Sequence, residues 1–470
     1  MVEYLNILKQ FDKREMMRTI SGSDCLVRTY ADYHRDICRC AQKLESLLGP
    51  VEGRHIGIIG TSDYEYLVIM AAIIFSRGVA IPFNNRETED NVLAAVKISE
   101  AELIISEEMP YSGALKELVK TIDKEGFFEK ETTEKQLRDF SDDEADRTAV
   151  ILFTSGTTSL SKGVDLSAGS LFKVLRNNLP DEYRGGTDKT EGIVAYTNSP
   201  FYHVGGIMPW LSWTELGVTM CLSEDSRNIL SDLESNRIDM AAVIPTVLKL
   251  WVKSLKKNKI ERLGGVKYIY AGGAALDPNT MDLFYSNGIS VIQLYGMTET
   301  GGDITVNYDM LNHGTSVGRV AEGVTLSFID GEICVDSFGN MKGYYKNPEE
   351  TEKTLKSGII YTGDLGYMDE DGLVYITGRK KNLIILSGGE NVSPEELENL
   401  LYKNPAIAEC KAYEKDDRIW ADVYAPAASE TEIKEYVSKL NTKLPIYKRI
   451  YNVVVKENEL EKTASGKIKR

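Results

Sequence analysis

The chain has 470 residues, a formal net charge of −16 and 42% hydrophobic residues. This length exceeds a single ordinary hydrophobic core, so we expect two or more domains. The acidic balance disfavours a protein that wraps nucleic acid, because binding a phosphate backbone requires a basic surface. The sequence has no apolar run that reaches the roughly 20 residues needed to span a bilayer.

The N-terminus and the cysteines favour the cytoplasm. Residues 1–17 mix acids and bases through their apolar positions and lack the uninterrupted apolar core of a signal peptide. The six cysteines are scattered, and the pair Cys38 and Cys40 has no second pair at the spacing of a zinc site. We therefore predict reduced thiols that are mostly buried, and a cytoplasmic location.

Strand-type and helix-type segments alternate along most of the chain. The pattern begins with a buried strand at 54–60, an apolar helix at 64–75 and a second strand at 79–83. Further short apolar strands are expected at 149–153, 192–197, 240–244 and 266–271. Strands without polar alternation are typical of parallel sheets that helices cover on both faces. The pattern predicts an α/β fold with parallel sheets, and the acidic segment 141–146 is interpreted as a solvated linker.

The pattern changes after residue 316. Short strands with turns are expected at 325–329, 332–335 and 373–377, which predicts a small β-rich subdomain. The last segment has its own strand and helix signals, and Ser393 followed by Pro394 is a strong helix start. We predict a large N-terminal domain of residues 1–380 and a small α+β domain of residues 381–470.

A loop rich in glycine and hydroxyl groups follows the strand at 149–153. It contains Thr154, Ser155, Gly156, Thr157 and Thr158. Glycine lets backbone N–H groups turn towards an anion, hydroxyls add donors, and Lys162 adds a positive charge. These features predict a phosphate-binding loop. The loop is not a Walker motif, because Ser161 replaces the second glycine and no Ser or Thr follows Lys162.

Three short motifs follow in the central part of the chain. The first comes directly after a predicted strand, where the carboxyl end of a sheet offers a ligand crevice, and consists of Gly272, Gly273, Ala274 and Ala275. The second follows apolar residues and consists of Tyr295, Gly296, Met297, Thr298 and Glu299. The third runs from Tyr361 to Asp364, with Arg379 further on. An aspartate after glycine is common in turns and is also a natural acceptor for ribose hydroxyls.

Two more glycine motifs lie near the C-terminus, namely Gly388-Gly389 and Ser465-Gly466-Lys467. In this order the motifs resemble those of the acyl-adenylate-forming enzyme superfamily, which includes acyl-CoA synthetases, aryl-acid ligases, adenylation domains of peptide synthetases and luciferases. The resemblance extends from about residue 50 to the end of the chain. It implies that ATP activates a carboxylic acid as an acyl-AMP and that a thiol then takes the acyl group.

The resemblance implies roles for the first motifs in binding ATP. The loop of residues 154–158, together with Lys162, would hold the β- and γ-phosphates. Gly273, Ala274 and Ala275 would line the adenine, on which Tyr295 would stack beside Gly296.

The resemblance also implies which residues contact the α-phosphate, the metal and the ribose. Thr298 would bond the α-phosphate, and Glu299 would hold a magnesium ion. Such an ion offsets the negative charge that builds on phosphate oxygens during attack on the α-phosphorus. Asp364 and Arg379 would bind the ribose.

The acyl pocket is expected near His203 and Gly272. His203 follows Tyr202 in a setting that resembles the family's gate to this pocket. Peptide-synthetase domains tend to place an aspartate nearby to hold the substrate amine, and residues 199–203 contain none. We therefore expect an acyl or aryl acid without an α-amino group.

The resemblance implies that the C-terminal domain moves during the reaction. Lys467 would lie between the substrate carboxylate and the α-phosphate, where a unit charge at about 4 Å contributes on the order of 4 kcal/mol at an intermediate dielectric. After adenylation the domain would rotate about a hinge at Lys381. Gly388 and Gly389 would then replace the lysine loop beside the pantetheine thiol.

The chain departs from the family pattern in its phosphate loop, where Ser159 and Ser161 replace a glycine and a proline, and at Ala275, which replaces a proline. The region 316–350 matches the family at both ends but is shorter between them. We predict ATP, Mg²⁺ and CoA as cofactors. The alternatives are a carrier-protein phosphopantetheine as the acceptor, or a non-catalytic nucleotide-binding homologue, against which the intact Glu299 and Lys467 argue.

Overall fold

The computed structural model describes residues 4–21, 24–128, 133–154, 162–173, 187–273, 276, 281–387, 390–462 and 468–469. The chain divides into two compact units: unit 1 is residues 1–325 and 335–360, and unit 2 is residues 326–334 and 361–470. The chain passes between them within β16 (Val324–Ile329), β17 (Glu332–Ser337) and β20 (Ile359–Met368). The boundary that the sequence predicts between residues 380 and 381 lies inside unit 2. It remains a prediction of where the C-terminal domain rotates.

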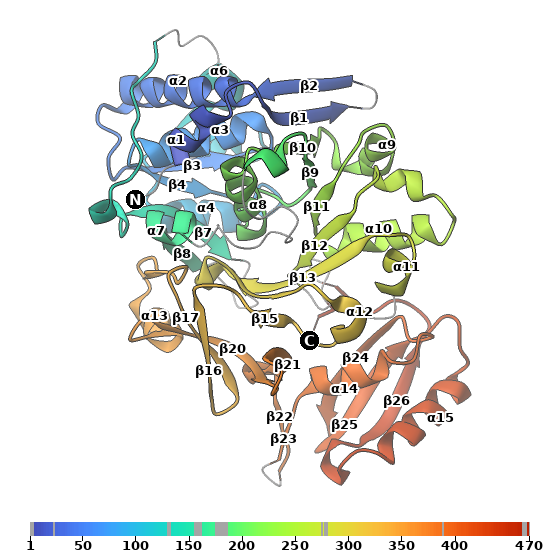
Figure 1. Ribbon diagram of the computed structural model, residues 1–470. Helices are drawn as coiled ribbons and strands as arrows, with labels where there is room; N and C mark the ends of the chain where they lie inside the picture. Colours follow the sequence, from blue (N-terminus) through green and yellow to red (C-terminus); the bar gives the residue numbers. More distant parts are fainter. Residues whose placement is uncertain are drawn as a thin grey trace. The chain divides into compact units, whose positions relative to one another are not determined.

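The first sheet of unit 1 has the strand order β18-β8-β7-β4-β3-β5-β6, of which β8, β7, β4 and β3 are labelled in Figure 1. Its strands are β3 (His55–Ile59), β4 (Val79–Pro82), β5 (Leu103–Ser106), β6 (Lys120–Asp123), β7 (Thr148–Thr154), β8 (Lys162–Ser167) and β18 (Gly343–Tyr344). Strands β7, β4, β3, β5 and β6 run parallel, and β8 and β18 continue the sheet antiparallel. The loop after β7 therefore leaves from the carboxyl edge of the parallel strands, where α/β sheets bind ligands.

Helices cover this sheet with apolar side chains. Helix α3 (Tyr64–Phe75) is buried along its length and contacts β3 and β4, while α2 (Tyr30–Leu48) packs against α3. Helices α4 (Glu89–Ser99) and α5 (Ser112–Leu118) share a core with the strands. The short helices α6 (Lys124–Phe128) and α7 (Ala168–Lys173) follow β6 and β8. Helix α3 begins where expected because the Asp63 side chain accepts a hydrogen bond from the Tyr66 N–H.

The second sheet of unit 1 has a parallel centre, β13-β12-β11-β9-β10-β1, with antiparallel β14 and β15 beyond β13 and antiparallel β2 beyond β1. Its strands are β1 (Glu15–Ser21), β2 (Asp24–Thr29), β9 (Val194–Thr197), β10 (Thr219–Ser223), β11 (Met240–Val243), β12 (Tyr268–Gly272), β13 (Ser290–Met297), β14 (Gly302–Asn307) and β15 (Gly318–Val320). Helices α9 (Ile229–Glu234), α10 (Pro245–Leu255) and α11 (Met281–Tyr285) form one core with it, and α8 (Val204–Glu215) contacts β9 and β10. Helices α12 (Met310–His313) and α13 (Pro348–Thr354) complete unit 1.

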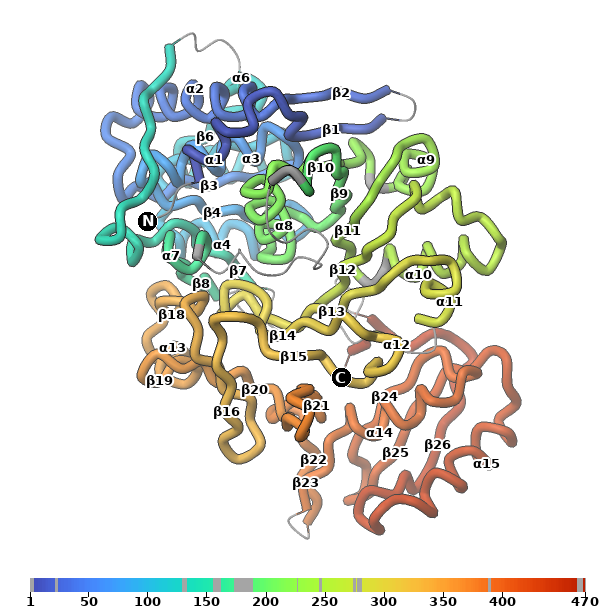
Figure 2. The backbone as a smooth tube through the Cα atoms, in the orientation of Figure 1, coloured from blue at the N-terminus to red at the C-terminus, as the bar shows by residue number. Residues whose placement is uncertain are grey.

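The first fifty residues carry no motif, yet they complete this second sheet. Strand β1 pairs in parallel with β10, and β2 pairs antiparallel with β1. Helix α1 (Tyr4–Gln10) lies against α8 (Figure 2), where the hydroxyls of Tyr4 and Thr214 share a hydrogen bond of 2.6 Å. The N-terminal segment is therefore part of the core of unit 1.

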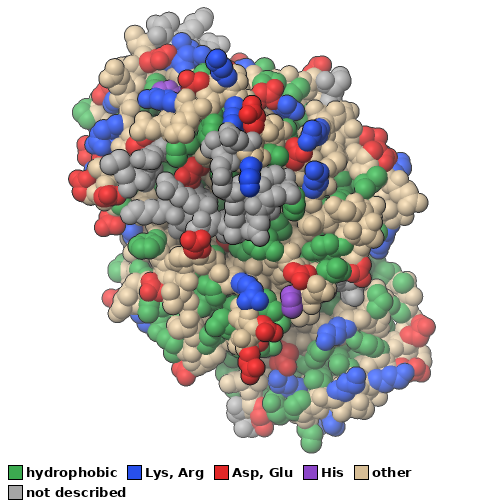
Figure 3. Space-filling model, viewed as in Figure 1, with side chains coloured by type: hydrophobic (Ala, Val, Ile, Leu, Met, Phe, Trp, Pro, Cys, Tyr) green, Lys and Arg blue, Asp and Glu red, His purple; other side chains and the backbone are tan. Residues whose placement is uncertain are grey.

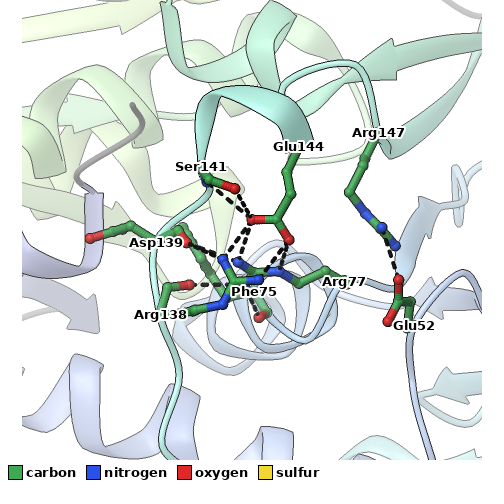
Figure 4. A network of polar contacts seen from close by, with 8 residues as sticks. All are labelled: Glu52, Phe75, Arg77, Arg138, Asp139, Ser141, Glu144 and Arg147. Carbon is green, nitrogen blue, oxygen red and sulfur yellow. Dashed lines mark hydrogen bonds and ion pairs between the residues drawn. The ribbon is translucent and has the colours of Figure 1, made fainter.

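An ion-pair network anchors the segment that leads into β7 (Figure 4). The Arg77 guanidinium donates to both carboxylate oxygens of Glu144, at 3.0 and 3.1 Å, and the Ser141 N–H and hydroxyl also donate to Glu144. These bonds lower the pKa of Glu144, whose side chain is 12% exposed. The expectation of a solvated linker at 141–146 is therefore wrong for Glu144, because Arg77, whose side chain is 10% exposed, binds it, while Asp142 and Asp143 are exposed.

Unit 2 contains an antiparallel pair, β20 and β21 (Leu373–Arg379), a short pair, β22 (Ile384–Ile385) and β23 (Asn391–Val392), and a sheet of β24 (Glu409–Lys415), β25 (Arg418–Tyr424) and β26 (Ile450–Lys456). Helices α14 (Pro394–Leu401) and α15 (Glu430–Asn441) share the core of the last sheet. The predicted start of α14 is confirmed, because the Ser393 hydroxyl accepts a hydrogen bond from the Glu396 N–H at 3.2 Å.

The predicted fold class is confirmed: parallel α/β sheets in a large N-terminal part, short strands from β15 to β21, and an α+β C-terminal part. In the part of the chain that the structure describes, no helix has the length and apolarity needed to cross a membrane. None of the six cysteines, all of which are described, forms a disulfide, and all are buried except Cys25. On the face seen in Figure 3, basic side chains are interspersed among acidic ones.

Candidate active site

The phosphate-loop motif joins two neighbouring antiparallel strands. Thr154 ends β7 and Lys162 begins β8, and the two residues are paired across the strands. Ser155, Gly156, Thr157 and Thr158 lie outside the described residues. The described part of the motif thus consists of its first hydroxyl and its lysine, held side by side at the carboxyl edge of the sheet.

Lys162 has two partners within unit 1. Its ammonium group forms an ion pair with Glu350, which lies in α13, and it lies 4.8 Å from the centre of the Tyr344 ring. Hydrogen bonds from Lys162 and Lys353 lower the pKa of Glu350 to about 2. The cation predicted to bind phosphate is therefore held by a carboxylate and an aromatic ring, at the same edge as Thr154.

The second central motif lies at the end of β13, where a tight turn follows the strand. Thr298 and Glu299 are in the one-turn helix η8 (Thr298–Thr300), and the Thr300 hydroxyl donates to the carbonyl oxygens of Met297 and Gly302, at 2.9 Å each. A side chain at position 296 would lie 2.1 Å from the carbonyl oxygen of Gly302. Gly296 is therefore required for the close approach of β13 and β14 that shapes this turn.

Glu299 is tied to the segment around β18 at two points. Its carbonyl oxygen accepts from the Met341 N–H at 2.8 Å, and its Oε1 accepts from the Tyr344 hydroxyl at 2.7 Å. Burial and the neighbouring Glu299 carboxylate raise the pKa of Tyr344, so this hydroxyl stays protonated and donates. Sequence reasoning assigned no role to Tyr344, although the segment 341–345 that contains it matches the family pattern.

The Glu299 carboxylate fits the chemistry of a magnesium ligand. Carboxylate oxygens suit Mg²⁺, which proteins usually bind through one or two carboxylates together with substrate phosphates and water. No other described residue bonds to the second oxygen of Glu299. Among the described residues there is also no cluster of three or more His, Cys, Asp or Glu side chains that could hold a metal by itself. Glu299 therefore suits an ion that arrives with a nucleotide.

The first central motif and Tyr295 lie at the ends of adjacent strands. Gly272 ends β12 and pairs with Leu294 of β13, directly before Tyr295. A side chain at position 272 would lie 2.9 Å from the Leu294 carbonyl oxygen, and Gly273 has a positive φ of 79°. Gly272 thus allows the close approach of β12 and β13, and Gly273 allows a backbone conformation that other residues rarely adopt. Ala274 and Ala275 lie outside the described residues.

His203 lies at the start of α8 and lines a cavity of about 20 Å³ in unit 1. The other lining residues are Phe83, Asn84, Glu87, Asn91, Val92, Ala95 and Phe153. Desolvation by the surrounding protein lowers the pKa of His203 below its ordinary value of 6.5, so the imidazole is neutral at pH 7. Phe153 directly precedes Thr154, so this cavity lies next to the phosphate-loop motif.

In unit 2 the structure brings together the two residues predicted to bind ribose. Asp364 and Arg379 are paired across β20 and β21, and the Nε of Arg379 lies 2.6 Å from Oδ1 of Asp364. Lys381 is in the one-turn helix η9 (Lys380–Asn382), two residues beyond Arg379. Gly388, Gly389 and Lys467 lie outside the described residues.

A family model described as AMP-binding enzyme matches residues 10–345. The chain belongs to the AMP-binding enzyme family. The match begins at residue 10, so the expectation that the resemblance starts near residue 50 is wrong, because β1, β2 and α2 belong to the matched region.

Similar proteins cover nearly the whole chain. A 2-succinylbenzoate–CoA ligase of Bacillus cereus (strain Q1) is 28% identical over 473 residues, which cover 94% of this chain and 92% of that protein. A 4-coumarate–CoA ligase-like protein of Oryza sativa subsp. japonica is 28% identical, with 94% of this chain and 86% of that protein covered. The structure of O-succinylbenzoate coenzyme A synthetase from Bacillus subtilis in complex with AMP has a TM-score of 0.83 at 22% identity, with 100% and 97% covered.

Together the family and these relatives establish the reaction class. The chain is an AMP-forming acid–thiol ligase, which uses ATP to activate a small-molecule carboxylic acid and transfers the acyl group to a thiol.

Proposed function

We propose that Lys162 and Glu299 form the phosphate and magnesium site of this ligase. The supporting observation is that both side chains contact one residue, Tyr344, so that a cation and a carboxylate lie close together at the end of β7 and β13. A magnesium nucleotide would need both, because the carboxylate would hold the ion and the lysine would offset the remaining negative charge of the phosphates.

The neighbouring motifs would complete the nucleotide site. Thr154 and residues 155–158 would hold the β- and γ-phosphates, Thr298 the α-phosphate, and Tyr295 with Gly272–Ala275 the adenine. When bound, the magnesium ion supplies electrostatic stabilisation of the α-phosphate oxygens during attack by the acid. The residues themselves bind and orient the two anionic reactants, which must approach each other.

We further propose an aryl or acyl acid without an α-amino group as the substrate. The cavity beside His203 has aromatic walls from Phe83 and Phe153. Its acidic residue, Glu87, already accepts hydrogen bonds from the side-chain amides of Asn84 and Asn91, and residues 199–203 contain no aspartate that would hold an amino group. The relatives named above are ligases of 2-succinylbenzoate and a 4-coumarate ligase-like protein, whose named acids are aromatic. Aromatic carboxylic acids of this kind are therefore the first substrates to test.

The C-terminal residues would act in turn during the two half-reactions. In this proposal Lys467 stabilises adenylate formation, Gly388 and Gly389 line the thiol path during transfer, and Lys381 is the hinge between residues 1–380 and 381–470. Lys467→Ala should abolish adenylation and leave transfer from supplied acyl-AMP. A bulky residue at Gly388 should do the reverse. Equal damage to both steps by either variant would contradict the assignment.

The test of substrate class is acid-dependent exchange between ATP and pyrophosphate, measured without thiol across aryl, fatty and amino acids. Exchange with aryl or fatty acids would support the proposal, and exchange with α-amino acids alone would overturn it. CoA and a phosphopantetheinylated carrier protein would then be compared as acceptors, with faster transfer to CoA expected. ATP binding without exchange for any of these acids would place the substrate outside the three classes tested. We place the reaction in the cytoplasm, where CoA and ATP are available.

A further inference from the structure

Tyr344 contacts two of the charged residues in the proposed ATP site. Its hydroxyl donates a hydrogen bond of 2.7 Å to Oε1 of Glu299, and the ammonium of Lys162 lies 4.8 Å from its ring centre. The side chain is 7% exposed, so its position is determined by packing. The two contacts use different parts of one rigid side chain, and they can therefore be removed separately.

The backbone around Tyr344 is joined to both motifs. Gly343 and Tyr344 pair with Asp165 and Val164 of β8, only two residues beyond Lys162. The Met341 N–H donates to the Glu299 carbonyl oxygen at 2.8 Å. The strand β18 thus holds the start of β8 and the turn after β13 at fixed positions relative to Tyr344.

A second set of bonds holds β18 itself. The Tyr344 N–H donates to the Thr351 hydroxyl at 2.9 Å, and that hydroxyl donates to the Asn347 carbonyl oxygen at 2.8 Å. Thr351 lies in α13, the helix that also carries Glu350, the ion-pair partner of Lys162. The tyrosine therefore belongs to a rigid support and not to a loose loop end.

We propose that Tyr344 is a positioning residue that orients Glu299 for magnesium and Lys162 for the ATP phosphates. A neutral hydroxyl donor fixes one carboxylate oxygen without cancelling the charge, which leaves the other oxygen for a cation. The electron-rich ring face attracts the lysine ammonium and restricts its side chain. The inference rests on the proposed roles of Glu299 and Lys162 in the ligase.

The test measures metal binding directly. Free Mn²⁺ is counted by electron paramagnetic resonance in the presence of the enzyme and α,β-methylene-ATP, which cannot be cleaved to AMP and pyrophosphate. Tyr344→Phe removes the hydroxyl and keeps the ring, so Mn²⁺ affinity should fall about tenfold or more, as for loss of other groups that orient metal ligands. Affinity for the metal-free nucleotide should remain within twofold. Tyr344→Leu should weaken both, because Lys162 also loses the ring.

Tyr345 offers a matched control on the same strand end. Its hydroxyl also contacts a glutamate, Glu100, at 3.2 Å, and its ring lies 5.3 Å from the ring of His55, away from Glu299. Tyr345→Phe should leave Mn²⁺ affinity unchanged, and an equal loss in both tyrosine variants would overturn the proposal as a general effect on folding.

Glu299→Gln separates this inference from the proposal on which it rests. If Glu299→Gln weakens Mn²⁺ binding and Tyr344→Phe does not, the role of Tyr344 is wrong while Glu299 remains the metal ligand. If Glu299→Gln leaves Mn²⁺ binding unchanged, both assignments are overturned. Weaker binding in both variants, with Tyr345→Phe unaffected, is the result expected.

Discussion

Arg379 lies directly opposite Asp364, with its Nε 2.6 Å from Oδ1 and a terminal nitrogen 3.3 Å from Oδ2. The Asp364 side chain is 5% exposed, whereas that of Arg379 is 47% exposed. The guanidinium thus orients a buried carboxylate from its open side. The two residues that the resemblance assigns to ribose therefore hold each other in place. We expect a substitution of either residue to disturb the position of the other.

The first prediction concerns the geometry of this pair. Arg379→Lys keeps the charge but loses the planar fork that engages both oxygens of Asp364, so the KM for ATP should rise roughly tenfold, as for loss of a hydrogen bond between charged groups. The measurement is ATP–pyrophosphate exchange at varied ATP. Arg418→Lys, in the exposed part of β25, serves as the control and should leave the KM unchanged. An unchanged KM in Arg379→Lys would contradict a role in nucleotide binding.

The second prediction concerns competition for Lys162. Glu350 now pairs with the lysine that we assign to the phosphates, so Glu350→Gln should release it and lower the KM for ATP two- to fivefold, corresponding to up to about 1 kcal/mol for a partly exposed ion pair. Glu349→Gln is the matched control, because Glu349 contacts Lys353 and is 81% exposed. A higher KM in Glu350→Gln than in the control would show that Glu350 positions the lysine instead of competing for it.

The third prediction follows from the pKa of Glu350, which falls from an ordinary 4.5 to about 2 in the folded state. A carboxyl with a depressed folded pKa stabilises the fold above its unfolded pKa and loses this contribution as the pH falls towards its folded pKa. Wild-type protein should therefore be more stable than Glu350→Gln at pH 7, with the difference shrinking from pH 4.5 downwards. Urea unfolding at pH 7, 5, 4 and 3.5 measures it, and a difference that grows on acidification would refute the sign.

The fourth prediction uses the network of Figure 4, where two arginines bind Glu144 from different environments. The Arg77 side chain is 10% exposed, and that of Arg138 is 67% exposed. Arg77→Ala removes the less exposed of the two partners and leaves Glu144 with Arg138 and Ser141, so it should cost about 1–3 kcal/mol of unfolding free energy. Arg138→Ala should cost much less, because exposed ion pairs contribute little. Chemical unfolding of both variants measures the two losses of unfolding free energy. Equal losses would show that the exposure of the arginine does not determine its contribution to stability.

The fifth prediction concerns His203, whose pKa is lowered below 6.5 by desolvation. The imidazole is then neutral throughout pH 7–9, so its ionisation should leave the KM for the acid constant over this range. Protonation at more acidic pH places a charge beside the cavity, and an acidic limb in the wild-type profile should disappear in His203→Gln. His313→Gln, at the end of α12, should keep that limb. Persistence of the limb in His203→Gln would assign it to another group.

Local patterns predicted the elements whose causes are local. The bounds of α3 match the prediction because an apolar run and the Asp63 cap are both contained in a dozen neighbouring residues. The start of α14 was equally predictable from Ser393 and Pro394. The N-terminal strands β1 and β2 were not predicted. Strand β2 is largely exposed and forms only by pairing with β1, which itself depends on β10, about two hundred residues away.

For the site, the sequence alone determined which chemical groups are available and in what order: hydroxyls and a lysine in one motif, a threonine and a glutamate in the next, an aspartate and an arginine in the third. Only the tertiary structure decided which of them share a partner. Tyr344 binds Glu299 and faces Lys162 because β18 pairs with β8, and Glu350 reaches the same lysine from α13. The physical reason is that pairing between distant strands depends on hydrogen bonds and burial across the whole sheet, which no short window of sequence encodes.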